Sequence, residues 1–408
     1  MRLADPAQQA PAARAPAPEG RRVVHVITMI ARGGAENHLM DLVRYQVAHG
    51  CRVSVAFLKG DPYWAAELRR LGVAVVPLGL RFYGDPLPLV RLRRLLSAAA
   101  PELVHAHLPP AELYVRAALA GGGPGGVPLV ISKHNDSPFR RGDPRLVLPV
   151  ARWVGRRADA VVAISESVRR RVLRDGLAAS PSRVVTVPYG LDAAPFLERD
   201  EAAVRRLRAE WGAGEGTVLF GTVARMVPQK SLHTLLEGFA RLRASRPAAD
   251  LRLVLAGTGP LERALRGRAE ALGIAERCVW AGFREDIVRV MQALDVFVLT
   301  SLWEGFGLVL LEAMAAARPV AASAASAIPE IVVDGCTGRL FAPGDPEGLR
   351  AALDELLDPA RRRAYGAAGR ERARSFSVER MGAATADLYE RVLAGRAAVR
   401  GPAGRGRP

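Results

Sequence analysis

The chain alternates between short apolar runs and longer amphipathic stretches along most of its length. The runs are rich in Val, Ile and Leu, which favours buried strands, and the stretches between them have the spacing of helices. Strands are predicted at 23–28, 52–58, 73–77, 103–107, 129–133, 160–164 and 183–187, and then at 217–223, 251–255, 279–281, 296–299 and 319–322. Because the pattern contains no tight hairpin turns, these strands should be parallel and joined by helical crossovers.

The alternation breaks once, from Pro188 to Gly216, which divides the chain into halves. The predicted fold class is α/β, with two Rossmann-like domains whose parallel sheets face a central cleft. The predicted parts are a disordered tail (1–20), a first domain (21–195), a linker region (196–216), a second domain (217–376), a C-terminal helix that crosses back to the first domain (377–395) and a second disordered tail (396–408). A single (β/α)8 barrel is the alternative, but it does not explain two separate glycine-marked phosphate signals.

The net charge is +17 and is carried almost entirely by Arg, which is also typical of a GC-rich genome. No nucleic-acid motif is found, so an anionic membrane surface ranks as the first charge-selected partner. The basic helix predicted at 86–99 and the stretch 140–157, with Phe139 and Trp153, are candidates for a membrane-facing surface. Three scattered cysteines fit a reducing compartment, and no apolar run approaches the ~18 residues of a membrane span. We expect a cytoplasmic protein that binds peripherally to the inner face of the cytoplasmic membrane.

The stretch from Thr300 to Glu312 contains several candidate ligand-binding groups close together. It follows a buried strand, and two glycines flank Phe306 where a helix is predicted to begin at about Leu308. Free backbone N–H groups at a helix start bind phosphate, and glycines allow a ligand to come close. Carboxylates cannot bind phosphate but can hold sugar hydroxyls, so Glu304 and Glu312 predict a ligand with both phosphate and sugar.

Other candidate groups follow the predicted strands. Arg225 and Lys230 come after the strand 217–223, where open α/β sheets bind ligands, and both can bind phosphate oxygens. Gly33-Gly34 and Gly257-Thr-Gly259 are weaker signals, because neither completes a dinucleotide-binding fingerprint.

Three histidines mark the ends of two strands in the first half: His105, His107 and His134. A metal site would need an acidic ligand that is missing, so hydrogen-bonded structural roles are favoured for His105 and His107. The sequence also contains no Asp-x-Asp, no nucleophile elbow and no Walker lysine motif. A phosphate ligand would therefore be neutralised by Arg, Lys and helix dipoles, and neither a metal nor another cofactor is expected.

These residues together resemble a known family. Glu304-Gly-Phe-Gly-Leu-Val-Leu-Leu-Glu312 resembles the Glu-x7-Glu motif of the family-4 retaining glycosyltransferases of the GT-B fold. Arg225 to Lys230 resembles that family's phosphate-binding pair, Gly33 to Glu36 its glycine loop, and Ile328 to Gly338 its late signature. The resemblance extends from about Val23 to Leu393.

The resemblance implies a role for each matching residue. Arg225 and Lys230 would bind the donor diphosphate, Glu304 the sugar hydroxyls and Glu312 the nucleotide ribose. The backbone of Phe306, Gly307 and Leu308 would hold phosphate and sugar, and His134 would lie beside the reacting sugar. The glycines near the phosphate would be Gly33, Gly34 and Gly257. Lys230→Ala is expected to abolish transfer and leave the fold intact.

The implied function is transfer of a hexose from a nucleoside-diphosphate sugar to a lipid-linked or glycan acceptor, in cell-envelope or surface glycan biosynthesis. A nucleotide-sugar epimerase, a sugar phosphorylase and a non-enzymatic sugar-binding protein remain alternatives. The sequence departs from the family where many members have glycine: Ser231 follows the Lys, and Ser326-Ala327 replaces a glycine pair. The second departure leaves the donor specificity open.

Overall fold

The computed structural model describes residues 20–120, 126–135 and 144–400. It divides into two compact units, residues up to Gly190 together with those from Val378 onward, and Leu191–Ser377. The predicted tails 1–20 and 396–408 lie largely outside the described residues, as do Phe139 and the neighbouring basic positions up to 143. Residues 396–400 are the exception at the C-terminal end, because the last helix continues through them.

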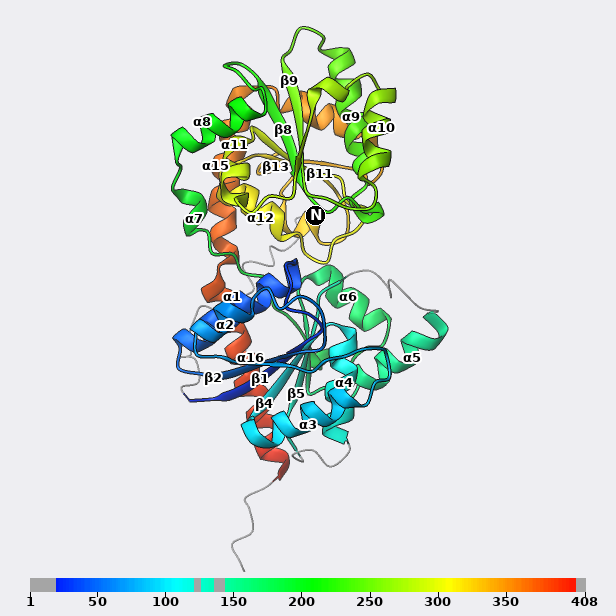
Figure 1. Ribbon diagram of the computed structural model, residues 1–408, viewed down its shortest axis with the longest axis vertical. Helices are drawn as coiled ribbons and strands as arrows, with labels where there is room; N and C mark the ends of the chain where they lie inside the picture. The colour runs from blue at the N-terminus through cyan, green and yellow to red at the C-terminus, as the bar shows by residue number, and fades with distance from the viewer. Residues whose placement is uncertain (1–19, 121–125, 136–143, 401–408) are drawn as a thin grey trace, which may run out of the picture. The chain divides into compact units, whose positions relative to one another are not determined.

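The first unit is a seven-stranded, fully parallel sheet with helices packed around it (Figure 1). Its strands follow the order β3-β2-β1-β4-β5-β6-β7 across the sheet. They are β1 (Arg22–Ile27), β2 (Arg52–Phe57), β3 (Ala74–Pro77), β4 (Leu103–His107), β5 (Leu129–Lys133), β6 (Ala160–Ala163) and β7 (Val184–Thr186). The helices are α1 (Gly34–Ala48), α2 (Ala65–Arg70), α3 (Leu87–Ala99), α4 (Pro109–Ala120), α5 (Pro144–Gly155), α6 (Glu166–Arg174) and α16 (Val378–Arg400). Ser165 caps the start of α6, since its Oγ accepts from Val168 N at 3.1 Å.

The C-terminal helix α16 belongs to the first unit. It packs against α1, and its side chains Met381, Leu388 and Tyr389 join a core cluster with Val23 of β1. Gly382 allows this close packing, because a Cβ at that position would lie 2.3 Å from the Tyr45 ring. The helix therefore returns to the first domain, as the sequence predicts.

The second unit is a six-stranded parallel sheet in the order β10-β9-β8-β11-β12-β13. Its strands are β8 (Val218–Val223), β9 (Leu251–Ala256), β10 (Cys278–Gly282), β11 (Val296–Leu299), β12 (Val320–Ser323) and β13 (Gly338–Phe341). Its helices are α7 (Ala194–Leu197), α8 (Glu201–Glu210), α9 (Leu232–Ser245), α10 (Glu262–Ala271), α11 (Ile287–Ala293), α12 (Leu308–Ala315), α13 (Ile328–Ile331), α14 (Pro346–Glu355) and α15 (Pro359–Ala373). In Figure 1, α9 and α10 lie on one side of this sheet, and α8 and α11 lie on the other.

Two separate parallel sheets confirm the prediction of two Rossmann-like domains and show that the barrel alternative is wrong. The region 196–216, set apart as a linker from the sequence, falls in the second unit, where α8 packs against α11. Strand β13 was not predicted. It is a short edge strand that begins with glycine, and Gly338 is needed there because a Cβ would lie 2.1 Å from the Val320 carbonyl oxygen.

Candidate functional site

Two loops of the second unit meet at the carboxyl edge of its sheet, because β8 and β11 are neighbouring strands. Leu302 N donates to Gln229 O at 2.8 Å, and Gln229 Nε2 donates to Trp303 O at 2.8 Å. Thr300 Oγ1 also donates to Lys230 O at 2.8 Å. These bonds hold the loop after β8 against the loop after β11, so the two phosphate and sugar candidates of the sequence lie side by side.

Lys230 and Glu304 form an ion pair at the junction of these loops. Their side chains are only 15% and 10% exposed, so the pair is largely shielded from water. Ser301 Oγ donates to the same Glu304 oxygen at 2.7 Å. Arg225 lies exposed in the loop after β8, and no carboxylate of the described residues comes within ion-pair distance of it. The junction therefore holds one compensated charge pair and one cation open to solvent.

The start of α12 lies in the same loop system. Gly307 precedes the helix with φ of +105°, a left-handed conformation that favours glycine, and no side chain caps the first turn. Phe306 is buried and packs edge-on against Phe376, with ring centroids 5.8 Å apart. This packing fixes where the first N–H groups of α12 point, and Glu312 follows Leu308 by about one turn. An uncapped helix start beside Lys230 can bind an anion.

The backbone around Gly257 requires a glycine at this position. Its φ is +127°, and a Cβ there would lie 2.1 Å from the Ala224 carbonyl oxygen. The glycine thus lets the loop after β9 approach the loop that carries Arg225. Its contact with a donor stays a prediction.

Gly33 and Gly34 lie in the first unit, after β1. Gly33 is extended, with φ of 177°, and Gly34 is the first residue of α1. A Cβ on Gly33 would lie 2.4 Å from a Glu36 side-chain oxygen, whereas a Cβ on Gly34 would meet nothing within 4 Å. Space for a ligand therefore exists beside Gly34, and the phosphate role of both glycines stays a prediction.

Five histidines of the first unit gather in one buried network. His25 Nδ1 and His107 Nε2 lie 3.0 Å apart, and His107 Nδ1 and His134 Nε2 lie 3.2 Å apart. His105 bonds to Tyr389 OH and to Ser132 Oγ, each at 2.7 Å. The fifth ring, His38, stacks on Tyr189, with centroids 4.4 Å apart.

The network has a defined hydrogen-bond direction. Gln46 Oε1 can only accept, so His25 Nε2 carries the proton in their 2.8 Å bond. His25 Nδ1 then accepts from His107 Nε2, and His107 Nδ1 accepts from His134 Nε2. His134 Nδ1 is left to accept from the Tyr189 hydroxyl at 2.6 Å. The assigned orientation of the Gln46 amide thus sets the tautomer of three histidines in a row.

Burial keeps these rings neutral. It lowers the pKa of His25 to about 4 and that of His134 to about 3, in the second case with help from the adjacent lysine charge. Burial is also the main cause that lowers the pKa of His38, His105 and His107 well below the usual value. The five imidazole rings therefore donate and accept hydrogen bonds as neutral groups at neutral pH.

Ring nitrogens of His25, His105 and His107 come within 4.8 Å of one another, which is close enough for a shared metal ion. However, both nitrogens of each ring already have a hydrogen-bond partner. The structure thus shows the hydrogen bonds that the sequence favours for His105 and His107, and the absence of a metal stays a prediction.

Sequence reasoning missed several members of this network: His25, His38, Gln46, Ser132, Tyr189 and Tyr389. His25 pairs in register with His105, but that pairing depends on β1 lying next to β4. The sequence did contain a signal, because each of these strands has a polar residue within an otherwise apolar run. Such a residue indicates a buried hydrogen-bond network once the strand order is known.

The fold and the site define a class of protein. The structure matches GT-B glycosyltransferases, including HepE from Anabaena in complex with UDP and glucose, with a TM-score of 0.79 and 21% identity over 91% of this chain and all of that one. A sucrose-phosphate synthase from Thermosynechococcus elongatus matches with a TM-score of 0.77 and 21% identity, over 92% of this chain and all of that one. The chain has the GT-B fold.

Two family models match in succession, "Glycosyltransferase Family 4" over residues 32–194 and "Glycosyl transferases group 1" over residues 204–372. The alpha-maltose-1-phosphate synthase of Mycobacterium tuberculosis is 30% identical over 89% of this chain and 96% of its own length. The D-inositol 3-phosphate glycosyltransferase of Kineococcus radiotolerans is 34% identical over 67% of this chain and 68% of its own. The chain belongs to the family-4 glycosyltransferases, and it is a glycosyltransferase of the GT-B type.

Proposed function

We propose that this glycosyltransferase transfers a hexosyl group from a nucleoside-diphosphate sugar to an acceptor hydroxyl, with retention of configuration at the anomeric carbon. The observation that carries the proposal is the junction of the β8 and β11 loops, where Lys230, Glu304 and the uncapped start of α12 meet. Phosphate and sugar need different partners, and this junction offers cations, N–H groups and a carboxylate within one loop system.

In the proposed reaction, the bond from the anomeric carbon to the diphosphate oxygen breaks, and the acceptor oxygen bonds to that carbon from the same face. The acceptor proton passes to an oxygen of the departing phosphate. Arg225, Lys230 and the dipole of α12 stabilise the negative charge that builds up on the leaving group. Glu304 and Glu312 bind hydroxyls of the sugar and the ribose. With these positive groups in place the reaction needs no metal ion, and this too is part of the proposal.

Relatives support the choice of donor and acceptor class. HepE from Anabaena has been solved with UDP-glucose, which favours a UDP-sugar donor here. The relatives whose names mention maltose 1-phosphate and inositol 3-phosphate, and a structural neighbour involved in lipopolysaccharide biosynthesis, favour a phosphorylated or lipid-linked glycan acceptor. We therefore propose a role in cell-envelope or surface glycan biosynthesis.

A screen of UDP-, GDP- and ADP-sugars for nucleotide release tests the proposal, run with and without a chelator. We expect one nucleotide class to be released, undiminished by the chelator, and a product whose anomeric configuration matches the donor by NMR. The Lys230→Met variant, chosen to match the volume of the lysine stem, should release little nucleotide. Release of orthophosphate from a sugar 1-phosphate would indicate a phosphorylase, and a changed sugar without a second product would indicate an epimerase.

We also propose that the first unit contacts an anionic membrane. Several large apolar side chains are exposed on it, among them Phe82, Tyr83, Val150 and Trp153, and Arg116 and Arg157 lie over the Trp153 ring. Interfacial surfaces combine aromatic and cationic side chains in this way. Among the described residues no helix is both long and apolar enough to cross a membrane. Vesicle flotation with Trp153→Ser as the altered protein tests the contact, and equal flotation on neutral and anionic vesicles would contradict it.

A further inference from the structure

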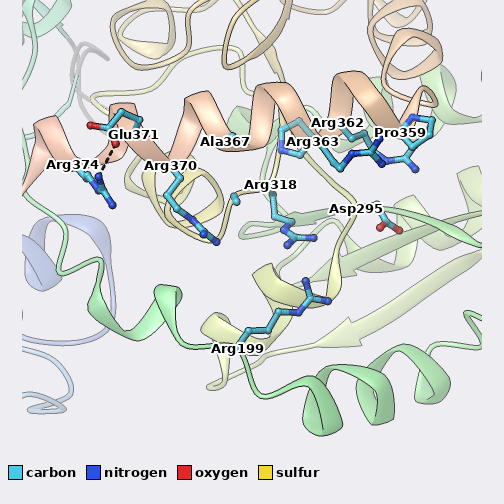
Figure 2. A pocket seen from close by; sticks show the side chains of 12 residues that line it. Arg199, Asp295, Arg318, Pro359, Arg362, Arg363, Ala367, Arg370, Glu371 and Arg374 are labelled. Atoms are coloured by element: carbon cyan, nitrogen blue, oxygen red, sulfur yellow. Dashed lines mark hydrogen bonds and ion pairs between the residues drawn. The ribbon is translucent and has the colours of Figure 1, made fainter.

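A cavity of about 540 Å³ lies within the second unit, beside the helix α15 (Figure 2). Its lining is dominated by arginines: Arg199, Arg318, Arg362, Arg363, Arg370 and Arg374. Only two carboxylates, Asp295 and Glu371, line the same space. The cavity has the size of an ordinary small-molecule site, and its charge is strongly one-sided.

The two carboxylates are already engaged. Asp295 Oδ2 accepts from Arg208 at 3.0 Å and from Leu219 N at 2.8 Å. Glu371 accepts from Arg374 Nη1 at 2.7 Å. Neither can neutralise the remaining arginines of the lining.

Three of these arginines bind only neutral carbonyl groups in the described part of the chain. Arg318 donates to Ala316 O and Leu294 O, both at 2.9 Å. Arg370 donates to Ala315 O at 3.2 Å. Arg362 does the same at the end of α14, where it donates to Leu356 O at 2.9 Å and Leu357 O at 2.7 Å. Carbonyls at helix ends stabilise a cation, but they do not cancel its charge.

The guanidinium groups also repel one another. Figure 2 shows Arg199 and Arg318 pointing toward each other across the cavity. Burial and, after it, the charge of Arg199 lower the pKa of Arg318 to about 10, although Asp295 opposes the change. The side chain still carries its charge at neutral pH. Arg199 pairs with Glu201 at 3.1 Å and Arg374 pairs with Glu371, so among the described residues Arg318, Arg362 and Arg370 are cations of the lining without a matching anion.

The cavity is separate from the proposed donor site. Asp295 precedes β11 and Pro319 precedes β12, so the cavity opens at the amino edge of the parallel sheet. The Lys230–Glu304 junction lies at the carboxyl edge. At about 3.3 Å per residue, the five steps from Asp295 to Thr300 separate the two places by roughly 16 Å.

We propose that this arginine cavity is a second anion site, which binds a small ligand bearing phosphate groups. Guanidinium groups bind phosphate oxygens with two parallel N–H bonds, and the side chains whose other N–H groups bond carbonyls are fixed in place before the ligand arrives. The phosphate belongs either to a soluble metabolite or to a lipid headgroup, and both offer the same chemistry to the cavity.

Calorimetric titration with inorganic pyrophosphate tests the site, in an Arg225→Ser background that weakens binding at the donor loops. The altered protein carries Arg199→Ser and Arg363→Ser, because both side chains are exposed and their loss should leave the fold intact. The control carries Arg263→Ser and Arg266→Ser on α10, two exposed arginines outside the cavity, and loses the same charge.

We expect the cavity variant to bind pyrophosphate about tenfold or more weakly than its parent, and the control to stay within about twofold. Flotation on vesicles containing phosphatidic acid then distinguishes the sources, in a Trp153→Ser background that weakens the proposed membrane contact of the first unit. Loss of flotation only in the cavity variant indicates a lipid headgroup, and unchanged flotation a soluble ligand. Equal pyrophosphate affinity in parent, cavity variant and control would overturn the proposal. That result would leave nucleotide release, and hence the proposed transferase activity, unaffected.

Discussion

The ion pair between Lys230 and Glu304 allows the structure to be tested by a double-mutant cycle. The two side chains are 15% and 10% exposed, so removing either charge leaves the other largely desolvated. In the Lys230→Met variant, Glu304 keeps the Ser301 hydroxyl as a partner, which supplies one hydrogen bond but no charge. In the Glu304→Gln variant, the ammonium group is left without its carboxylate.

The expected magnitudes follow from this burial. Breaking a buried pair costs about 3–5 kcal/mol, and the remaining exposure and the Ser301 bond reduce this to about 2–4 kcal/mol for each single variant. The double variant removes both charges and should cost less than the sum, by about 2 kcal/mol or more. An exposed pair would give a coupling energy of at most about 1 kcal/mol.

Hydrogen exchange measured by mass spectrometry over a urea series gives the free energy of unfolding for peptides of β8 and β11. This local readout avoids assuming that both units unfold together. A coupling energy below about 1 kcal/mol would refute the argument that the pair is desolvated. The prediction that Lys230→Ala leaves the fold intact is tested by the same measurement, because that substitution also removes the counter-ion of Glu304.

The same variants separate two roles in donor binding. Glu304 forms an ion pair with the Lys230 ammonium group, and its carboxylate places a negative charge beside the proposed diphosphate site. Glu304→Gln should therefore bind UDP at least as tightly as the parent and lose the added affinity for the UDP-sugar, whereas Lys230→Met should lose affinity for both. Weaker UDP binding in Glu304→Gln than in Lys230→Met would contradict this division of roles.

Further predictions concern stability. His25 and His134 have pKa values of about 4 and about 3 in the fold and near 6.5 in the unfolded chain. The unfolded chain therefore binds more protons below pH 6.5, and the free energy of unfolding decreases as the pH is lowered, by about 2 kcal/mol for each histidine at pH 5. Hydrogen exchange should show this loss in β4 and not in β11. Gly257→Ala should cost about 2–4 kcal/mol through its positive φ and the 2.1 Å approach to a carbonyl oxygen, while Gly267→Ala, with nothing within 4 Å, should be neutral or stabilising in the same urea titration. Ser326→Gly should stabilise by about 0.5–1 kcal/mol, because φ is +48° there, and an unchanged urea midpoint would contradict this account.

Most strands were predictable because each is an apolar run between polar or glycine-containing segments. The ranges 103–107, 129–133 and 296–299 match the structure to the residue. Strand β13 was missed since an edge strand of four residues, Gly-Arg-Leu-Phe, has neither a continuous apolar run nor a clear alternation. Local pattern therefore predicts strands that are buried on both faces better than strands at the edge.

The departures from glycine at Ser231 and Ser326 were visible in the sequence, and the structure gives their physical meaning. Both residues have positive φ, +47° and +48°, so the backbone adopts a conformation that glycine would accept without strain. Ser231 compensates in part, since its hydroxyl lies 3.0 Å from Thr234 Oγ1. Both serines thus keep a backbone conformation that suits the glycine found there in many family members.

Contacts between distant segments could not be read from the sequence. Lys230 and Glu304 were each identified, but their contact depends on β8 lying beside β11 with β9 and β10 displaced to the other side. The histidine network depends in the same way on β1 lying between β2 and β4. Both follow from the strand order of a doubly wound sheet, which brings together the ends of strands that are separated along the chain.

The two units use different chemistry at the carboxyl edges of their sheets. The second unit gathers charged groups that suit a leaving group on which negative charge increases. The first gathers neutral imidazoles and hydroxyls whose hydrogen bonds already form a directed chain ending at His134 and Tyr189. A substrate hydroxyl that bonds to His134 must replace either Tyr189 or His107, since both ring nitrogens have partners. Replacing Tyr189 leaves the chain back to Gln46 intact, so Nδ1 is the nitrogen of His134 that a sugar hydroxyl should meet, as a donor.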